Sequence, residues 1–244
     1  MNNFTGKRGS YEDDGFQVIH TLLDEEQLTT IEQEVEAVTR QERSRFEEGD
    51  FFLAQDTDIV QQIEHLQKYS PYFRNLSINH QGIRDLVENI FSDHAVCDNV
   101  SYMAKPPRVG AVVPWHQDNA YYFLTPDDAL TVWIALDDST IKNGCLRIVP
   151  QSHKHGVIEH GPTGVRGISY GIKKVVDPKS EVAIELNRGD ASLHHCNLFH
   201  SSHPNTSDQP RRGLVMFFHA ERCSIDHETM DQYQQIRKKM IDNQ

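Results

Sequence analysis

The second half of the chain is a succession of short apolar runs, rich in β-favouring residues and separated by residues that break secondary structure. The runs lie at 96–103, 111–115, 130–136, 146–149, 182–186, 191–193 and 214–218, with Pro, Gly, Asn and Asp between them. Short strands without intervening helices are typical of antiparallel double sheets and barrels, because parallel strands need crossover helices. The pattern therefore predicts an antiparallel β core.

Residues 15–92, which precede this core, are predicted to be mostly helical. Asp24 stands three residues before Gln27, which is the spacing of a capping box, and apolar residues then recur at helical intervals. This pattern predicts an amphipathic helix over about 24–39. A second amphipathic helix is predicted over about 79–91.

Two segments complete the expected organisation. Residues 153–177 are rich in Gly and His and have no clear period, so we expect a loop over one end of the barrel. Residues 225–240 carry apolar residues near helical spacing and are predicted to form a closing helix. We expect one domain over residues 1–244, in which the helical part at about 15–92 precedes a β core at about 96–220.

The composition argues against several kinds of partner. With 24 Lys and Arg against 36 Asp and Glu, the formal charge is −12, which disfavours binding to nucleic acid or to an anionic membrane. The apolar stretch 132–136 is far shorter than the roughly 20 residues that span a bilayer, and residues 1–14 do not resemble a signal peptide. The four cysteines include no Cys-x-x-Cys pair, so we expect reduced thiols in a cytoplasmic protein.

The first candidate for chemistry is the tripeptide His116-Gln117-Asp118, which directly follows a β-favouring run. Side chains two residues apart in a strand point to one face, so the imidazole and the carboxylate would converge. A chain with 14 histidines and this many aspartates is expected to contain a His-x-Asp tripeptide by chance. The motif therefore needs an independent third ligand.

A histidine-rich segment supplies candidates for that ligand. Residues 189–202 combine a turn, a strand and a polar edge, and they contain His194, His195 and His200. Two histidines and one carboxylate on one face of an octahedral ion leave three adjacent positions open, as in non-heme Fe(II) oxygenases. A zinc hydrolase would more often show three histidines or a His-Glu-x-x-His helix, and the sequence has no such helix.

Arg211 is a second supporting feature, because it stands at the start of the run 214–218. A guanidinium that enters a barrel is costly to bury unless it meets a carboxylate, which it can bind in bidentate fashion. The alternative is that Arg211 and Arg212 form an exposed pair at a sheet edge after the turn at 205–210.

These motifs occur in an order that resembles the phytanoyl-CoA dioxygenase family of Fe(II)/2-oxoglutarate oxygenases. The resemblance covers nearly the whole chain and rests on residues 11–16 (YEDDGF), 116–118 (HQD), 133–138 (WIALDD), 143–146 (NGCL), 150–154 (PQSHK), 189–190 (GD), 200–202 (HSS), Asn205 and Arg211. The ordered set is far more specific than any one motif. One departure is Gln151, which stands where the family usually has glycine.

The resemblance implies a double-stranded β-helix, which is a jelly-roll or cupin-like fold, with N-terminal helices packed outside the barrel. It also implies that Fe(II) is bound by His116, Asp118 and His200. Halogenating relatives replace the metal carboxylate with a small residue so that chloride can bind the iron. Because Asp118 is present, hydroxylation or a related oxidation is expected instead.

By the same match, Arg211 would bind the distal carboxylate of 2-oxoglutarate, in a pocket that Ser202 and Trp133 help to line. The expected reaction consumes O2 and 2-oxoglutarate and releases succinate and CO2. No segment for holding a coenzyme A carrier is evident, so the expected partner is a small-molecule substrate other than an acyl-CoA.

Substrate contacts are expected from four polar side chains around the barrel mouth, namely Asn119, Tyr121, Tyr122 and His153. His194 and His195 flank the third ligand, and strand alternation does not decide whether either faces the metal. Two other functions stay open. A cupin-like metal-binding protein or isomerase that does not use O2 would need the metal ligands but not Arg211. A non-catalytic binding module should have lost at least one ligand.

Overall fold

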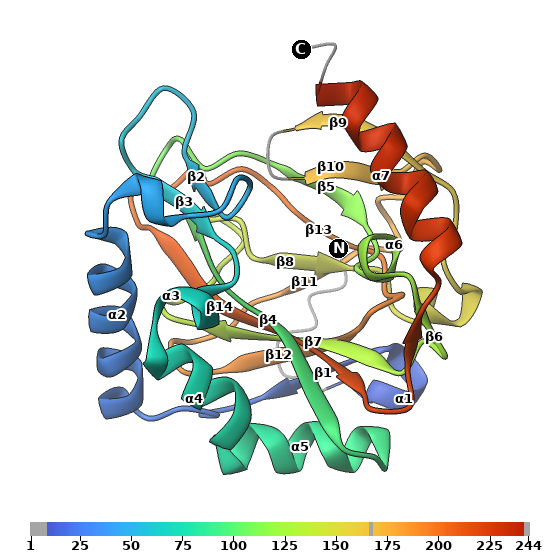
Figure 1. The fold of residues 1–244 in the computed structure, drawn as a ribbon, viewed down its shortest axis with the longest axis horizontal. Helices are drawn as coiled ribbons and strands as arrows, with labels where there is room; N and C mark the ends of the chain where they lie inside the picture. Colours follow the sequence, from blue (N-terminus) through green and yellow to red (C-terminus); the bar gives the residue numbers. More distant parts are fainter. Residues whose placement is uncertain (1–8, 166–167, 242–244) are drawn as a thin grey trace.

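Two antiparallel sheets face each other and form the body of the molecule (Figure 1). The structure is a computed structural model, and it describes residues 9–165 and 168–241. The larger sheet has seven strands in the order β1 (Phe16–Ile19), β12 (Ala191–His195), β7 (Ala129–Ala135), β14 (Arg211–Ala220), β4 (Ala95–Lys105), β3 (Val60–Ile63) and β2 (Phe51–Leu53). The smaller sheet has four, in the order β11 (Val182–Ile184), β8 (Leu146–Ile148), β13 (His200–Ser202) and β5 (Val113–His116). The prediction of an antiparallel β core is confirmed.

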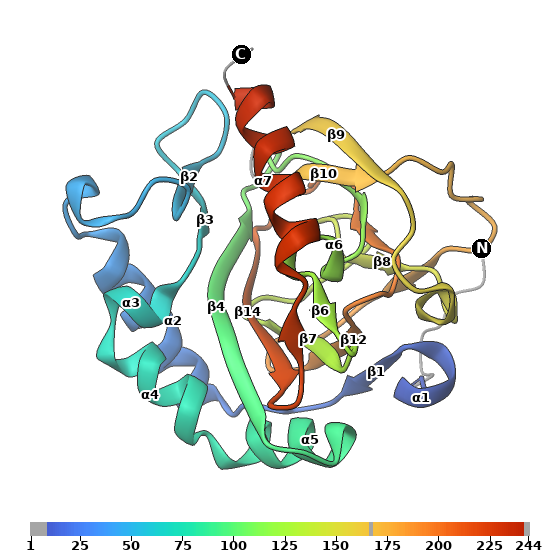
Figure 2. The ribbon, with the colours of Figure 1, turned by 45° about the vertical axis from the view of Figure 1, so that its right-hand side comes forward.

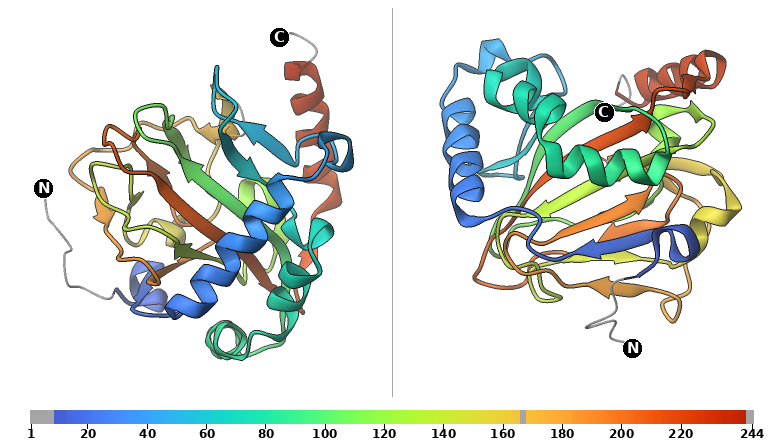
Figure 3. Two further views of the ribbon diagram at one scale, coloured as in Figure 1. Left: turned by 90° about the vertical axis from the view of Figure 1, so that its left-hand side faces the viewer. Right: turned by 90° about the horizontal axis from the view of Figure 1, so that it is seen from below.

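Helices cover the outer face of the larger sheet, as the view from below shows (Figure 3). They are α2 (Glu25–Thr39), α3 (Leu66–Tyr69), α4 (Pro71–Asn79) and α5 (Gln81–Phe91). The expected capping box is present, because the Asp24 side chain accepts from the Gln27 backbone while the Gln27 side chain accepts from the Asp24 backbone. The second predicted helix begins two residues late, at Gln81, since His80 caps its first turn.

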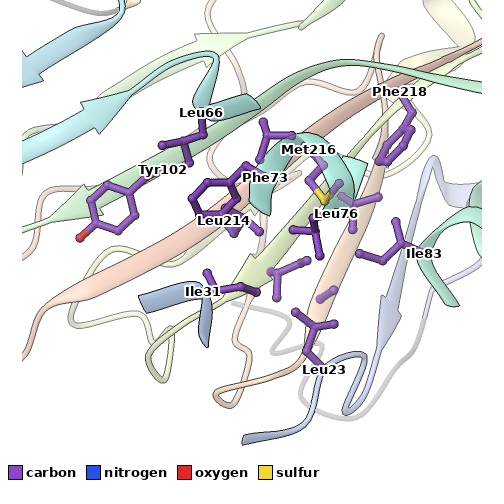
Figure 4. Packing of buried hydrophobic residues seen from close by; sticks show 14 of the residues in the cluster. Leu23, Ile31, Leu66, Phe73, Leu76, Ile83, Tyr102, Leu214, Met216 and Phe218 are labelled. Atoms are coloured by element: carbon purple, nitrogen blue, oxygen red, sulfur yellow. The ribbon is translucent and has the colours of Figure 1, made fainter. Parts of the chain in front are cut away.

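The main hydrophobic core lies between these helices and the sheet (Figure 4). Strand β4 shows how the sequence builds it. Val100, Tyr102 and Ala104 face the helices and join this core, whereas Met103 packs against a second apolar cluster between the two sheets. This alternation is the period of two that a strand imposes. It also turns Lys105, at the end of the strand, toward the barrel interior.

Residues 15–92 are less helical than predicted, because three short strands lie among the helices. Strands β1, β2 and β3 all lie within that range. Strand β1 is only four residues long and is held by pairing with β12, where Phe16 faces His194 and Ile19 faces Ala191. Such a strand depends on a partner more than 170 positions away, so local periodicity does not reveal it.

The segment 153–177 is also more regular than expected. It contains part of a short 3-10 helix (Ser152–His155) and a hairpin made of β9 (His160–Val165) and β10 (Ile168–Ile172). Residues 1–8, 166–167 and 242–244, which include parts of the single domain expected over 1–244, lie outside the described residues.

The closing helix is confirmed as α7 (His227–Ile241), which lies alongside the β9–β10 hairpin and α6 (Asn119–Tyr122) (Figure 2). Two short strands, β6 (Leu124–Thr125) and β15 (Ser224–Ile225), pair with each other just before it. A short helix α1 (Tyr11–Asp14) precedes β1. In the described part of the chain, every helix is too short or too polar to cross a membrane.

Candidate metal centre

The structure brings together the three residues for which metal binding was expected. His116 ends β5 and His200 begins β13, and the two residues are directly opposite in the smaller sheet. One possible ligand atom from each of His116, Asp118 and His200 lies within 4.8 Å of the others. Oδ1 of Asp118 is 3.8 Å from Nε2 of His116 and 3.3 Å from Nε2 of His200. All three side chains are largely buried.

Asp118 reaches this point by a turn and not by strand alternation. Strand β5 ends at His116, and Asp118 has helical backbone angles as the N-cap residue that precedes α6. The expectation that both side chains project from one strand face is therefore wrong, although the convergence that it predicted is present. Thr131 on β7 donates its hydroxyl hydrogen to Oδ2 of Asp118 at 2.6 Å, which leaves Oδ1 directed at the two imidazoles.

The two histidines are oriented for metal binding through Nε2. Nδ1 of His116 is 2.8 Å from the Pro114 carbonyl oxygen, and Nδ1 of His200 is 2.9 Å from that of Leu198. A nitrogen facing a carbonyl oxygen carries the hydrogen, so the Nε2 lone pair of each ring is available to a metal. The donor set therefore fits an ion that accepts two imidazoles and one carboxylate.

The charges of the site agree with this orientation for His116 and Asp118. Burial, reinforced by the neighbouring His200, lowers the pKa of His116 to about 3. Burial alone would raise the pKa of Asp118, but His200 and His194 hold it well below its ordinary value. Asp118 is therefore a carboxylate and His116 a neutral imidazole at neutral pH, and these are the forms that bind metals. Burial would lower the pKa of His200, but the Asp118 carboxylate raises it, so a metal would displace a proton from His200.

The structure shows which of the two histidines, His194 or His195, faces the candidate centre. His194 is buried, and its Nε2 lies 3.6 Å from Oδ2 of Asp118. His195 faces the other way, with its ring 6.0 Å from that of Tyr11 and 5.2 Å from that of His153. His194 thus neighbours the candidate centre, and His195 does not.

The two arginines are separated in the same way. Arg211 is only 5% exposed, and its guanidinium carbon lies 4.5 Å from the centre of the Trp133 ring, in the interior between the sheets. Its Nε has no hydrogen-bond partner among the described residues. Arg212 instead pairs with Asp137 and Glu32 on the outer side. The alternative of an exposed arginine pair at a sheet edge is wrong, because β14 lies between β7 and β4 and Arg211 is buried.

Ser202, expected to line the 2-oxoglutarate pocket, and the expected substrate contacts Tyr121 and Tyr122 have different surroundings. Ser202 is buried at the end of β13. Tyr121 contacts His116 edge to face at 6.1 Å between ring centres, and Tyr122 stacks on Phe217 at 3.7 Å.

Asn119 lines the cavity between α6, the β9–β10 hairpin and α7, and its side chain also forms hydrogen bonds with the backbone of Leu124. His153 lies beside His195 and Gly15, away from the three candidate ligands.

A cavity of about 340 Å³ lies beside the centre, between α6, the β9–β10 hairpin and α7. Its lining is mainly apolar and includes Phe123, His160, Tyr170 and Tyr233, but none of the three candidate ligands. His160 connects the two places, because its Nε2 accepts a hydrogen bond from the backbone of Gln117 at 3.2 Å. His160 itself is buried.

Fold and site together define a β-helix protein with a candidate metal centre of two histidines and one carboxylate at the ends of paired strands. The model of the phytanoyl-CoA dioxygenase family matches residues 11–213. The chain therefore belongs to this family. Its two sheets and outer helices are the expected double-stranded β-helix.

Curated relatives extend this result. A "Phytanoyl-CoA dioxygenase domain-containing protein 1 homolog" from Dictyostelium discoideum is 32% identical over 184 residues, covering 72% of this chain and 65% of the relative. A "probable alpha-ketoglutarate-dependent hypophosphite dioxygenase" from Stutzerimonas stutzeri is 28% identical over 230 residues, covering 89% and 79%. The matched region thus spans just under two thirds of the first relative.

Solved structures share the fold. EvdO2 from Micromonospora carbonacea var. aurantiaca, complexed with 2-oxoglutarate, is similar with a TM-score of 0.72 at 28% identity, over 89% of this chain and 91% of its own. SnoK, a non-heme alpha-ketoglutarate-dependent carbocyclase from nogalamycin biosynthesis, has a TM-score of 0.70 at 23% identity, over 88% and 83%. The likeness to SnoK concerns the fold alone.

Proposed function

We propose that the chain is an Fe(II)- and 2-oxoglutarate-dependent dioxygenase that hydroxylates or otherwise oxidises a small molecule, with release of succinate and CO2. One observation carries the proposal. Three donor atoms of the required types lie within 4.8 Å of one another, and the same barrel interior holds the buried Arg211, which has no carboxylate oxygen within 4.0 Å among the described residues. A buried charge without a counter-charge is costly, which indicates that an anion completes it.

When bound, Fe(II), 2-oxoglutarate and O2 together supply the oxidising chemistry. The chain's own residues prepare the place for them. His116, Asp118 and His200 present one donor each from one side, which leaves adjacent positions open for the two cosubstrates. Thr131 holds the second oxygen of Asp118 away from the two imidazoles. The metal site is thereby limited to one carboxylate oxygen.

Arg211 is the proposed anchor for the distal carboxylate of 2-oxoglutarate. A guanidinium presents two parallel donors that match a carboxylate, and the Trp133 ring below it fixes its plane. Ser202 is proposed to line the same pocket from β13. On the substrate side, contacts are proposed from Tyr121, whose ring lies 6.1 Å from that of His116, and from Tyr122, whose ring stacks on Phe217.

Hydroxylation is the proposed outcome, because Asp118 occupies the position that halogenating relatives leave to a small residue. The four cysteines are all unpaired, which supports the proposed cytoplasmic location. A cupin-like isomerase that does not use O2 would need the three metal ligands but not Arg211. The burial of that arginine over Trp133 therefore favours the oxygenase over the isomerase.

Anaerobic titration of the Fe(II)-loaded chain with 2-oxoglutarate tests the proposal. We expect the weak visible charge-transfer band of the metal chelate, and succinate once air is admitted with a substrate. His116→Ala should abolish the band, whereas the matched change of an exposed histidine, His155→Ala, should leave it intact. Absence of both band and succinate in the wild-type chain would refute the oxygenase function.

A further inference from the structure

Two buried cations lie on facing positions at one end of the barrel. Lys105 ends β4 and Arg211 begins β14, and the two residues are directly opposite in the antiparallel pair. Directly opposite residues project to the same face of a sheet. Lys105 is 3% exposed and Arg211 is 5% exposed. In the described part of the chain, no carboxylate oxygen lies within 4.0 Å of either.

The contacts of Lys105 place it at the border of the proposed 2-oxoglutarate pocket. Its Nζ donates to the carbonyl oxygens of Ala111 and His203, the latter at 2.9 Å. His203 directly follows Ser202, and Ala111 lies just before β5. An uncharged amine has two hydrogens, and these two carbonyls accept both. A third donor exists only when the amine is protonated.

The surroundings of Lys105 disfavour its charge. Burial and the neighbouring Arg211 lower the pKa of Lys105 to about 6. Burial lowers the pKa of Arg211 only to about 10, so Arg211 stays charged near neutral pH. Burial raises the pKa of Cys145, before β8, to about 11 and lowers the pKa of His203, after β13. The nearby Glu181 is paired with Arg147, and neither Glu181 nor Glu185 lies within 4.0 Å of Lys105 or Arg211. Without an anion, the pocket therefore holds one charge.

We propose that Lys105 is a second, inducible cation of this pocket, which takes a proton from solvent onto its Nζ lone pair when a dicarboxylate binds at Arg211. The inference rests on the proposed function, since it takes 2-oxoglutarate as the anion. The bound carboxylate offsets the repulsion between the two cations, and the new N–H is a donor that the empty pocket lacks. Lys105 acts here as a positioning residue for the cosubstrate.

Calorimetry on the wild-type chain tests the proton uptake directly. The chain is loaded with Fe(II) under anaerobic conditions and titrated with 2-oxoglutarate at pH 7.5, in buffers that differ in ionisation enthalpy. The carboxyls of 2-oxoglutarate are already ionised at this pH, and the metal is bound beforehand, so neither contributes protons. We expect uptake of about one proton per 2-oxoglutarate, and a Kd that rises about tenfold per pH unit between pH 7 and 8.

Two variants assign the proton to its residue. Lys105→Met should bind 2-oxoglutarate more weakly at pH 7, without proton uptake and with a Kd independent of pH. Lys105→Arg carries a permanent charge, so it should also bind without uptake. The exposed Lys154 gives a matched control, because Lys154→Met should keep the wild-type uptake. Thermal unfolding of each variant without 2-oxoglutarate verifies that it folds.

The outcomes distinguish this inference from the proposed function. Wild-type binding of 2-oxoglutarate without proton uptake would overturn the role of Lys105 and leave the oxygenase function standing. Uptake that persists in Lys105→Met would also overturn it, since another group would then be the acceptor. If the wild-type chain does not bind 2-oxoglutarate at all, the proposed function fails and the inference fails with it.

Discussion

Gly213 leaves the space that the Trp133 indole occupies. A Cβ atom added at position 213 would lie 2.3 Å from Cζ2 of Trp133, far inside van der Waals contact. Trp133 lies on the neighbouring strand β7, and the Arg211 guanidinium stacks on the same indole. Glycine at this position therefore sets where the indole lies, and the indole sets where the guanidinium lies.

Gly213→Ala should displace both side chains. Overpacking of this kind costs about 1–3 kcal/mol of stability, and we expect a larger Kd for 2-oxoglutarate in the anaerobic titration. Gly82→Ala is the matched control, because its Cβ atom would lie 3.6 Å from Cε1 of His80, which is an ordinary van der Waals contact. Unchanged 2-oxoglutarate affinity in a folded Gly213→Ala chain would show that the indole does not position Arg211.

Thr131→Val should weaken metal binding at the candidate centre. Valine keeps the shape of threonine but removes the hydrogen bond to Oδ2 of Asp118. Loss of such a support to a metal ligand typically costs 10–100-fold in metal affinity, roughly. Anaerobic Fe(II) binding, measured by calorimetry, checks this, and Thr131→Ser should restore most of the affinity. Thr30, whose hydroxyl binds only its own helix, supplies the control Thr30→Val.

Arg211 and Arg212 should have opposite phenotypes although they are adjacent. Arg212→Ala leaves Asp137 without a bidentate partner, and we expect a loss of about 1–2 kcal/mol, reduced by the partial exposure of the pair. Arg211→Ala removes a charge that has no counter-charge among the described residues, so stability should change little while the Kd for 2-oxoglutarate rises. Urea unfolding and the anaerobic titration, run on both variants, separate the two effects. A marked loss of stability in Arg211→Ala would contradict the assignment.

The sequence predicted what depends on local pattern. The β core and the helix after Asp24 follow from apolar periodicity and a capping box, and both are present. What it could not predict depends on strand register. Cross-strand pairing decides which of two adjacent residues faces the interior. It settles this for His194 against His195 and for Arg211 against Arg212.

Lys105 shows the same limit for the candidate site. A lysine at the end of a predicted strand is normally exposed, and no motif singles it out. Its burial results from the pairing with Arg211 and from carbonyls on two distant segments, at Ala111 and His203. The role of Thr131 could not be predicted for a similar reason. Its hydrogen bond to Asp118 joins β7 to the turn before α6, and local sequence pattern does not show that these two segments are neighbours.

The half-buried His195 should make the fold sensitive to acid. Burial lowers the pKa of His195 to about 4, against about 6.5 in an unfolded chain. Between these values the unfolded chain binds more protons than the folded one, so stability falls as pH falls. The contribution of neutral His195 is complete above about pH 6.5 and is lost progressively toward pH 4, by up to about 3 kcal/mol.

His195→Gln isolates this contribution, because glutamine has no charge to gain and its side-chain oxygen can still accept from the Asn197 backbone, as His195 does. The difference in urea midpoint between wild type and variant should shrink as the pH is lowered from 7 to 4.5. Other buried histidines titrate in both proteins, so they cancel from the difference. The exposed His227 gives the matched control variant His227→Gln. A constant difference for His195→Gln would mean that His195 is protonated in the folded chain at the same pH as in the unfolded one.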